Sequence, residues 1–269
     1  MGKLKNILWI VALIVLIVLI GVVAYGYYQN ATMEVKRPVA TMEVENFGTV
    51  KFELYPEYAP ETVANFITLA NRGFYDGLTF HRIVKDFMIQ GGDKNGDGTG
   101  LATTSDLKDD GDSTEYTIKG EFIANGVDNK LQFEEGTVAM ARSDYTSYSS
   151  SLTEESYNSG SSQFFIMTAK NTGLNGQYTS FGKVIEGMDV VHKIEEVEVT
   201  SSSDSEGTES TDSSSQEVSK PVNPPVITSI RVETNGVDYG LPETLTPFDY
   251  TSWLYQQYGI DPSSLTTTE

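Results

Sequence analysis

The most informative part of this sequence is residues 80–93, which read FHRIVKDFMIQGGD. Two short apolar segments, Leu78 to Val84 and Phe87 to Gln90, flank a polar pair, and this pattern predicts two β-strands joined by a turn. Because side chains alternate between the faces of a strand, His81 and Arg82 are expected to point in opposite directions. Taken alone, an arginine in such a strand is usually a solvated charge.

Similar short segments lie on both sides of this pair of strands. A hairpin is predicted over Ala40 to Val44 and Thr49 to Leu54, and further strands are predicted at Thr137 to Ala141, Gln163 to Thr168, Phe181 to Ile185 and Val226 to Val232. Glycine- and asparagine-rich turns between such strands are typical of a closed or nearly closed antiparallel barrel. We therefore expect a mainly β fold, a closed antiparallel eight-stranded barrel.

Two helices are expected to flank this barrel. The first opens at Pro60-Glu61, carries apolar residues at helical spacing and stops at Gly73, a residue suited to a helix C-terminus. The second is expected around Met188 to Ile194.

The N-terminus predicts a membrane segment. Ile7 to Tyr28 is an uncharged, mostly apolar run of about 22 residues, which as a helix would span the ~30 Å hydrocarbon core of a lipid bilayer. Lys3 and Lys5 precede it, so the positive-inside rule places the N-terminus in the cytoplasm and the rest of the chain outside. The alternative is a cleaved signal peptide, with Val22-Val23-Ala24 as the cleavage site.

Composition limits the class of partner and the chemistry. The chain of 269 residues has a formal net charge of −20 and no basic stripe, which argues against a nucleic-acid partner. It has no cysteine, which excludes disulfides, thiolate metal sites and a cysteine nucleophile. Residues 200–219 are almost wholly Ser, Thr, Asp, Glu and Gly, and such a segment is expected to be a disordered insertion.

Four motifs, in the same order, resemble those of the cyclophilin family of peptidyl-prolyl cis-trans isomerases. The first is residues 80–93, and the others are GTVAMAR at 136–142, SSQFFI at 161–166 and FGKVIEGMD at 181–189. The resemblance covers Val39 to Glu196 and a last strand near Val226 to Glu233. The anchor, the acidic insertion and the tail lie outside it. The expected organisation is therefore a cytoplasmic stub and anchor at 1–30, a linker at 31–38, a cyclophilin-like domain at 39–233 containing the insertion at 200–219, and a tail at 234–269. The sequence of the tail does not decide whether it packs on the domain.

The resemblance implies rotation of X-Pro peptide bonds without a metal or cofactor. Arg82 would be the catalytic residue, with its charge directed at the prolyl nitrogen and carbonyl region. The implied substrate-binding residues are Phe87, Met88, Phe165 and Leu174 around the proline ring, Gln90 and Gln163 along a polar edge, the backbone at Ala141 and Arg142, and Tyr178. His81 is assigned to structure.

Three departures from the best-known eukaryotic members are visible. Gly173 replaces a tryptophan beside the pocket leucine, and Tyr178 replaces a pocket histidine. The loss of tryptophan is expected to weaken binding of the cyclic-peptide inhibitor that names the family. The loop from Ser143 to Ser162 is longer than usual and is expected to alter substrate selection.

Two acidic segments could be mistaken for metal sites. Asp93-x-Asn95-x-Asp97-Gly98 begins like a calcium-binding EF-hand loop, but it follows a strand and has Thr104 where the bidentate glutamate belongs. The carboxylates of residues 106–115 fit a solvated loop better than a cation site. We expect no metal at either.

The preferred function is isomerisation of X-Pro bonds in exported proteins by a monomer at the outer face of the cell membrane. Its partners would be proline-containing segments of those proteins, together with the bilayer around Ile7 to Tyr28. Two alternatives are a non-catalytic proline-peptide-binding or chaperone-like surface module and an envelope protein with a vestigial isomerase fold.

Overall fold

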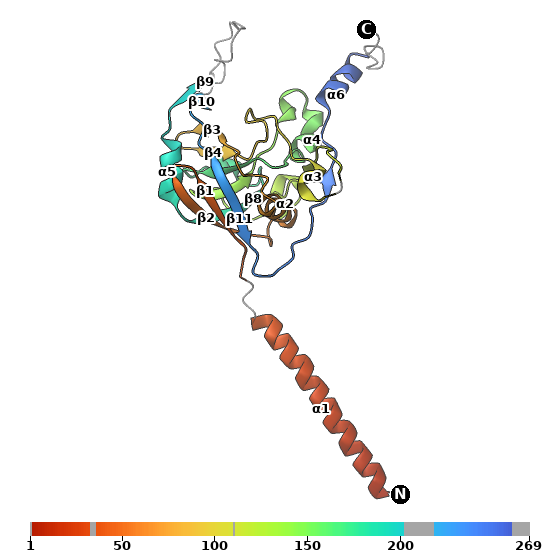
Figure 1. Ribbon diagram of the computed structural model, residues 1–269. Coiled ribbons are helices and arrows are strands. Elements are labelled where there is room, and N and C mark those ends of the chain that lie inside the picture. The colour runs from red at the N-terminus through yellow and green to blue at the C-terminus, as the bar shows by residue number, and fades with distance from the viewer. Residues whose placement is uncertain (1, 33–35, 110, 202–217, 260–269) are drawn as a thin grey trace. The chain divides into compact units, whose positions relative to one another are not determined.

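The computed structural model describes residues 2–32, 36–109, 111–201 and 218–259 (Figure 1). Its internal contacts divide the chain into two compact units, Met1–Lys36 and Arg37–Glu269, each of which is described here by itself.

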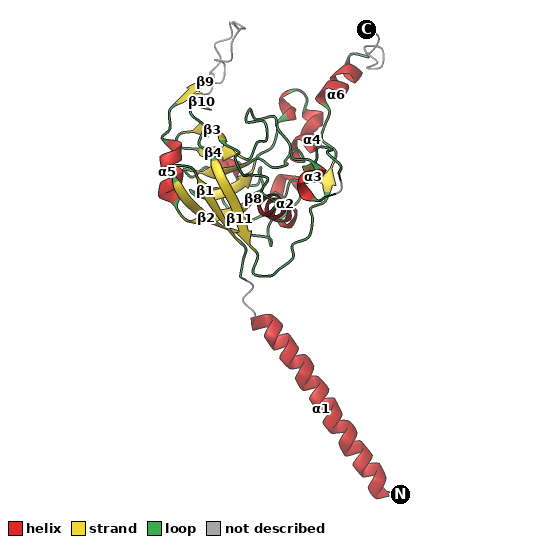
Figure 2. Cartoon of the chain, viewed as in Figure 1, coloured by secondary structure: helices red, strands yellow, loops and turns green. Residues whose placement is uncertain are grey.

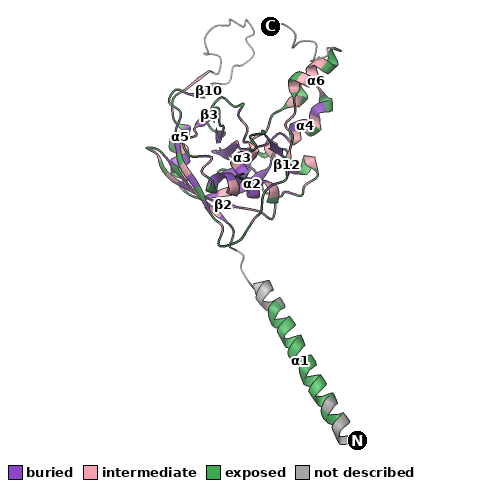
Figure 3. Cartoon of the chain, turned by 45° about the vertical axis from the view of Figure 1, so that its right-hand side comes forward, coloured by how far each residue is buried: buried purple, intermediate pink, exposed green. Residues whose placement is uncertain are grey.

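The described residues of the first unit include one helix, α1, which spans Gly2–Thr32. Its large apolar side chains are exposed, for example Ile10 at 59% and Leu19 at 57% (Figure 3). The segment Trp9–Gly26 is long and apolar enough to cross a membrane, as an anchor or a signal sequence would be. An apolar helix with no polar face requires an apolar environment.

The second unit is built on one curled antiparallel sheet of eight strands (Figure 2). The order across the sheet is β11-β1-β2-β8-β6-β7-β4-β3. The strands are β1 Val39–Val44, β2 Gly48–Leu54, β3 Phe80–Val84, β4 Met88–Gly91, β6 Thr137–Met140, β7 Phe164–Met167, β8 Ser180–Glu186 and β11 Ile227–Glu233. All eight predicted strands are therefore present, with ends that differ by one or two residues.

The predicted closed barrel is wrong, because the sheet is an open half-barrel whose edge strands are β11 and β3. The two edges approach each other at the isolated bridge Thr79–Val226. Beside it the Ile227 N–H donates to the Leu78 carbonyl at 2.7 Å, and the Phe80 N–H of β3 donates to the Pro225 carbonyl at 2.9 Å. Continued along β3, this antiparallel register would bring Pro225 and Pro224 opposite β3. Proline has no N–H to donate to a ladder, so the sheet does not close there.

The two predicted flanking helices are present as α2, Pro60–Asn71, and α5, Met188–Glu195. Shorter elements fill the connections, and they include two strand pairs outside the main sheet. These elements are α3 Thr104–Leu107, α4 Thr153–Tyr157, α6 Tyr250–Gln257, the 3-10 turns Ile123–Asn125, Tyr145–Ser147, Ser150–Leu152 and Thr172–Leu174, and the strands β5 Thr117–Ile118, β9 Val199–Ser201, β10 Val218–Pro221 and β12 Thr244–Leu245.

The acidic insertion lies at the β9–β10 pair. Thr200 pairs with Lys220, so the ends of the expected insertion are strand residues. The rest of that predicted segment, residues 202–217, lies outside the described part of the chain.

The main core lies between the concave face of the sheet and α2. Phe66 of α2 is its centre, with ring centroids 5.2–5.7 Å from the rings of Phe52, Tyr75, Phe164 and Phe181. All five aromatic side chains are fully buried. This packing ties α2 to four separate segments of the second unit.

A buried carboxylate caps the start of α2. Glu121 accepts hydrogen bonds from the Glu61 N–H at 3.1 Å, the Thr62 N–H at 2.8 Å and the Thr62 hydroxyl at 2.7 Å. The first N–H groups of a helix have no hydrogen-bond partner within the helix. A negative charge beside them also interacts favourably with the positive end of the helix dipole. Glu121 thus fixes the helix that carries Phe66.

We predict that Glu121→Ala lowers the free energy of unfolding by about 2–3 kcal/mol, because buried donors lose their acceptor. Urea unfolding of the Arg37–Glu269 unit, followed by circular dichroism, measures this. The control is Glu154→Ala, which removes an exposed carboxylate and is expected to cost under about 0.5 kcal/mol. Equal losses in the two variants would contradict the capping role.

Candidate active site

The candidate site lies on the outer face of β4, β6 and β7, with Arg82 at its edge. Arg82 on β3 is paired across the strands with Gln90 on β4, and its guanidinium donates to Gln90 Oε1 at 3.2 Å. It also approaches the sulfur of Met88 at 3.7 Å. Arg82 is half-buried, so its charge is positioned by the sheet while part of it remains accessible.

Three further hydrogen bonds extend this pair into a polar relay. Gln90 Nε2 donates to Gln163 Oε1 at 3.0 Å, and Gln163 Nε2 donates to the carbonyls of Gly98 and Gly100 at 3.0 and 3.1 Å. Carbonyl oxygens only accept, so the amide nitrogen of Gln163 must face them. The Gln163 amide oxygen therefore faces Gln90 and accepts from its amide nitrogen. The amide oxygen of Gln90 is then left to face Arg82.

The loop that supplies those carbonyls is held by Asp93. Its carboxylate accepts from the N–H groups of Asn95, Asp97 and Gly98 at 3.2, 2.7 and 2.6 Å. In this EF-hand-like segment the first carboxylate is therefore engaged by the loop's own backbone. Within the described residues, no three histidine or carboxylate side chains gather as a metal site.

An apolar cluster separate from the main core lies beside the relay. It brings together six of the residues that the sequence predicts for substrate binding, and adds four that it does not. The predicted members are Phe87, Met88, Ala141, Phe165, Leu174 and Tyr178, and the additional ones are Val84, Phe133, Ala139 and Met167. The Phe165 ring is stacked on Phe133 and edge-on to Tyr178, with centroids 6.1 and 5.9 Å apart.

Phe133 has no recognisable signal in the sequence, since it lies in a loop without periodicity. Its position is set at long range, because its N–H donates to Asn175 Oδ1 and its carbonyl accepts from the Asn171 N–H, both at 2.9 Å. Met167 could have been found, because it shares the face of β7 that Phe165 occupies.

Ala141 pairs with a neighbouring strand through its backbone, whereas Arg142 contacts aromatic rings through its side chain. The Ala141 N–H donates to the Gln163 carbonyl at 2.9 Å and so serves strand pairing. The Arg142 guanidinium lies 4.5 Å from the ring centroid of Tyr178 and 5.3 Å from that of Tyr157, and it donates to the Gln177 carbonyl. Its charge supports the wall of the site through cation–π contacts.

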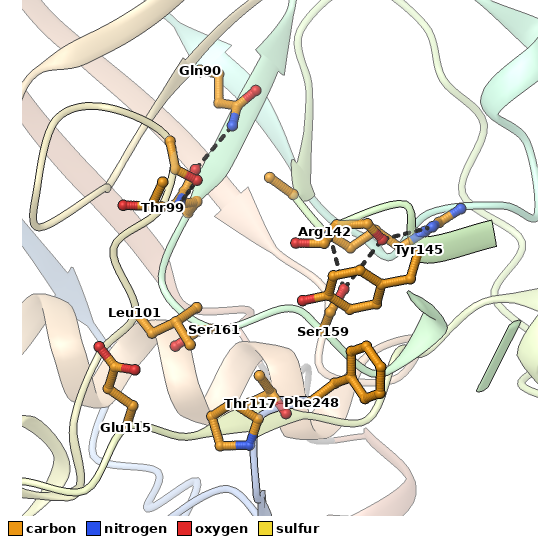
Figure 4. Close-up of a pocket in the computed structure, with 15 residues that line it drawn as sticks. Gln90, Thr99, Leu101, Glu115, Thr117, Arg142, Tyr145, Ser159, Ser161 and Phe248 are labelled. Carbon is orange, nitrogen blue, oxygen red and sulfur yellow. Dashed lines mark hydrogen bonds between the residues drawn. The ribbon is translucent and has the colours of Figure 1, made fainter. Parts of the chain in front are cut away.

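A cavity of about 390 Å³ adjoins the relay (Figure 4). Gln90, Gln163 and Ala141 line one part of it, and Pro247 and Phe248 of the C-terminal tail line another. Within its described residues, 234–259, the tail therefore packs on the domain at Pro247 and Phe248. The sequence does not decide this packing, and no sequence motif indicates that the tail reaches the site.

The turn that carries Phe87 is held from behind by α5. The Asp86 N–H, in a residue with φ of 57°, donates to the buried Glu195 carboxylate at 2.6 Å. His192 lies between Glu195 and Glu135, with nitrogen–oxygen distances of 3.0 and 2.7 Å. Hydrogen bonds to Glu195 and then Glu135 raise the pKa of His192.

His81 lies between Phe80 and Arg82, where the register of β3 on β4 shifts, so the predicted alternation of His81 and Arg82 stays a prediction. His81 is about nine-tenths buried, and this burial lowers the pKa of its imidazole. The pKa of His192 is therefore raised above the ordinary value of a histidine, and the pKa of His81 is lowered below it.

Comparison with known proteins gives consistent matches. A family model described as cyclophilin-type peptidyl-prolyl cis-trans isomerase/CLD matches residues 39–232. Peptidyl-prolyl cis-trans isomerase B of Bacillus subtilis (strain 168) is 41% identical over 146 residues, covering 54% of this chain and 82% of that protein. Peptidyl-prolyl cis-trans isomerase-like 1 of Mus musculus is 36% identical over 157 residues, covering 58% and 79%.

A solved structure is similar in fold. It is a cyclophilin-type peptidyl-prolyl cis-trans isomerase of Cryptosporidium parvum, crystallised in the presence of the dipeptide Ala-Pro. The TM-score is 0.53 at 26% identity, and the match covers 72% of this chain and 98% of that one.

We predict a pKa above 6.5 for His192 and below 6.5 for His81 in an NMR titration of the imidazole resonances. A histidine whose pKa is higher in the folded than in the unfolded protein stabilises the fold. This stabilisation is complete at pH values below the pKa of the unfolded state, and it is lost as the pH rises through the pKa of the folded state. Glu135→Gln is therefore expected to lower the pKa of His192 and to destabilise the fold at pH 5.5 more than at pH 8.5. An unchanged His192 pKa in that variant would contradict the assigned contact.

Proposed function

The chain belongs to the cyclophilin-type peptidyl-prolyl cis-trans isomerase family, and on that premise we propose that Arg82 and the adjoining apolar cluster catalyse rotation of X-Pro bonds in exported proteins. The observation that supports this most directly is the relay in which Gln90 and Gln163 orient Arg82 beside Met88 and Phe165. The relay and the cluster together offer a fixed positive charge next to an apolar surface.

Such a site matches the chemistry of amide rotation. The barrier of ~18–20 kcal/mol comes from resonance between the nitrogen and the carbonyl, and it falls when the nitrogen pyramidalises and accepts a hydrogen bond. The Arg82 guanidinium would donate that hydrogen bond, while Phe87, Met88, Phe165 and Leu174 would hold the ring. An acceleration of about 10⁵ requires roughly 7 kcal/mol of transition-state stabilisation, and no nucleophile is needed.

The relay adds preorganisation to this charge. Because Gln90 already accepts from the guanidinium, Arg82 does not have to leave a fully solvated state when substrate binds. A donor that is oriented beforehand stabilises the transition state without reorganisation during the reaction.

The second function that we keep is a non-catalytic module that binds proline-containing peptides. The apolar cluster alone would suffice for such binding, and the long loop at 143–162 would add contacts. The two functions differ in what they require of Arg82, since only catalysis depends on its charge in the transition state.

We further propose that α1 holds the isomerase unit at the outer face of the cell membrane with the N-terminus in the cytoplasm. Support comes from the length and apolar composition of Trp9–Gly26 and from the flanking Lys3 and Lys5. Outside the cytoplasm, exported chains refold with X-Pro bonds that exchange in tens to hundreds of seconds without a catalyst.

We predict that Arg82→Ala lowers kcat/KM on a short X-Pro peptide by about 100-fold or more, while the peptide affinity changes less than about threefold. Exchange spectroscopy by NMR reports both the isomerisation rate and the binding. The control is Lys85→Ala, which removes an exposed cation of the same turn that pairs with Glu196. Wild-type protein that binds peptide without accelerating exchange would favour the binding module.

We predict that the full chain expressed in a bacterium resists carbonate extraction from membranes and keeps residues 1–30 by intact mass. Protease added to spheroplasts is expected to digest the Arg37–Glu269 unit. A soluble product that begins after Ala24 would establish the signal-peptide alternative. A protected isomerase unit in intact spheroplasts would overturn the proposed orientation.

A further inference from the structure

The C-terminal tail is attached to the domain beside the candidate site, although it lies beyond the residues that match the family. Residues 39–232 match, whereas β12 at Thr244–Leu245 pairs with β5, Thr117–Ile118. Just before β12, the Glu243 N–H donates to Glu61 Oε2 at 2.6 Å. The tail is thus fixed by backbone hydrogen bonds before it reaches the cavity.

Five aromatic side chains then join the tail to the long loop at 143–162. The centroids of Tyr145 and Phe248 are 4.9 Å apart, and those of Tyr148 and Tyr250 are 4.5 Å apart. Trp253 packs against Phe248 and Tyr250 at 6.3 and 5.8 Å. We call this set the aromatic clamp. It joins two features of this chain, the extended loop and the tail, at one edge of the cavity.

The clamp turns the edge of the peptide site into a walled pocket. The cavity of about 390 Å³ is shared between relay residues Gln90 and Gln163 and tail residues Pro247 and Phe248. In Figure 4, Phe248 lies across the cavity from Leu101 and Glu115. Substrate residues advance only about 3.3 Å each when extended, so a residue a few positions from a bound proline reaches this pocket.

The lining of the pocket combines apolar surface with a carboxylate. Leu101 and Phe248 offer apolar surface, and Glu115 offers an exposed carboxylate. Arg142 is the one cation among the described lining residues, and its guanidinium is engaged by Tyr178 and by backbone carbonyls. Its charge is therefore directed into the wall. A side chain with a long apolar stem and a cationic end complements this arrangement.

We propose that the pocket walled by Phe248 is a specificity pocket that selects a lysine or arginine within three residues of the substrate proline. The stem of that side chain packs between Phe248 and Leu101, and its charge lies near Glu115. This inference rests on the proposed isomerase function, and it adds a substrate class to it.

The test uses X-Pro peptides that are identical except for one residue. Lys, Met or Glu is placed at one position at a time, up to three residues on either side of the proline, and kcat/KM is measured for the full chain in detergent. At one position we expect the order Lys, Met, Glu. The Lys preference over Met is expected to shrink at 0.5 M salt, because an exposed ion pair is screened.

Two variants separate the wall from the charge. Phe248→Ala is expected to lower kcat/KM about three- to tenfold for both the Lys and the Met peptide, with no change for an Ala peptide. Glu115→Gln is expected to remove the preference for the Lys over the Met peptide. In the wild type this preference is expected to be a two- to fivefold ratio of kcat/KM, about the size of an exposed ion pair. The matched controls are Tyr258→Ala, an exposed aromatic residue of the tail, and Glu154→Gln, an exposed carboxylate of α4.

The outcomes distinguish this inference from the proposed function. If no peptide is isomerised, the function itself fails. If all peptides are isomerised equally, or if Phe248→Ala lowers the rate for the Ala peptide as much as for the others, the specificity pocket is refuted while the isomerase stands. A preference for Glu over Lys would also overturn it.

Discussion

The carbonyl groups of Gly98 and Gly100 are the constraint on which the site depends. Because they can only accept hydrogen bonds, they set the orientation of the Gln163 amide, then that of Gln90, and then the position of the Arg82 guanidinium. The loop can present them because Asp93 binds its backbone amides. A Cβ on residue 100 would lie 2.2 Å from Asp93 Oδ1, so glycine is required at that position. The segment that looks like a calcium loop is thus the support of an arginine.

Strand alternation divides the sheet into a structural face and a functional face. On β7, Phe164 and Ile166 belong to the main core, whereas Phe165 and Met167 belong to the cluster beside Arg82. On β4, Ile89 and Met88 are divided in the same way. The candidate site is therefore the back of the same strands whose front packs against α2, so the backbone that positions the pocket is held by the main core.

Most of the fold could be predicted from local sequence patterns, whereas the features set by long-range contacts could not. Alternation gave the eight strands, and Pro60 with Gly73 gave the limits of α2 within one residue. Barrel closure was mispredicted because it depends on the residues that precede the last strand and face β3. Pro224 and Pro225 lie there, and proline has no N–H to donate to a ladder. The site residues came from motif resemblance, since spacing alone does not distinguish Phe165 from a core phenylalanine. Phe133 and Phe248 reach the site through contacts more than 35 residues apart, which no local pattern encodes.

The tail is joined to the domain by a two-residue strand pair and by surface aromatic rings, and Phe248 belongs to neither apolar core cluster. Substitutions there leave the packing around Phe66 and the relay to Arg82 untouched, so they carry little cost for folding. Selection can then act on substrate choice separately from catalysis. A short appendage of this kind can change the edge of the peptide site while the sheet that carries Arg82 stays the same, and it is the part of the chain where related proteins with different clients are expected to differ most.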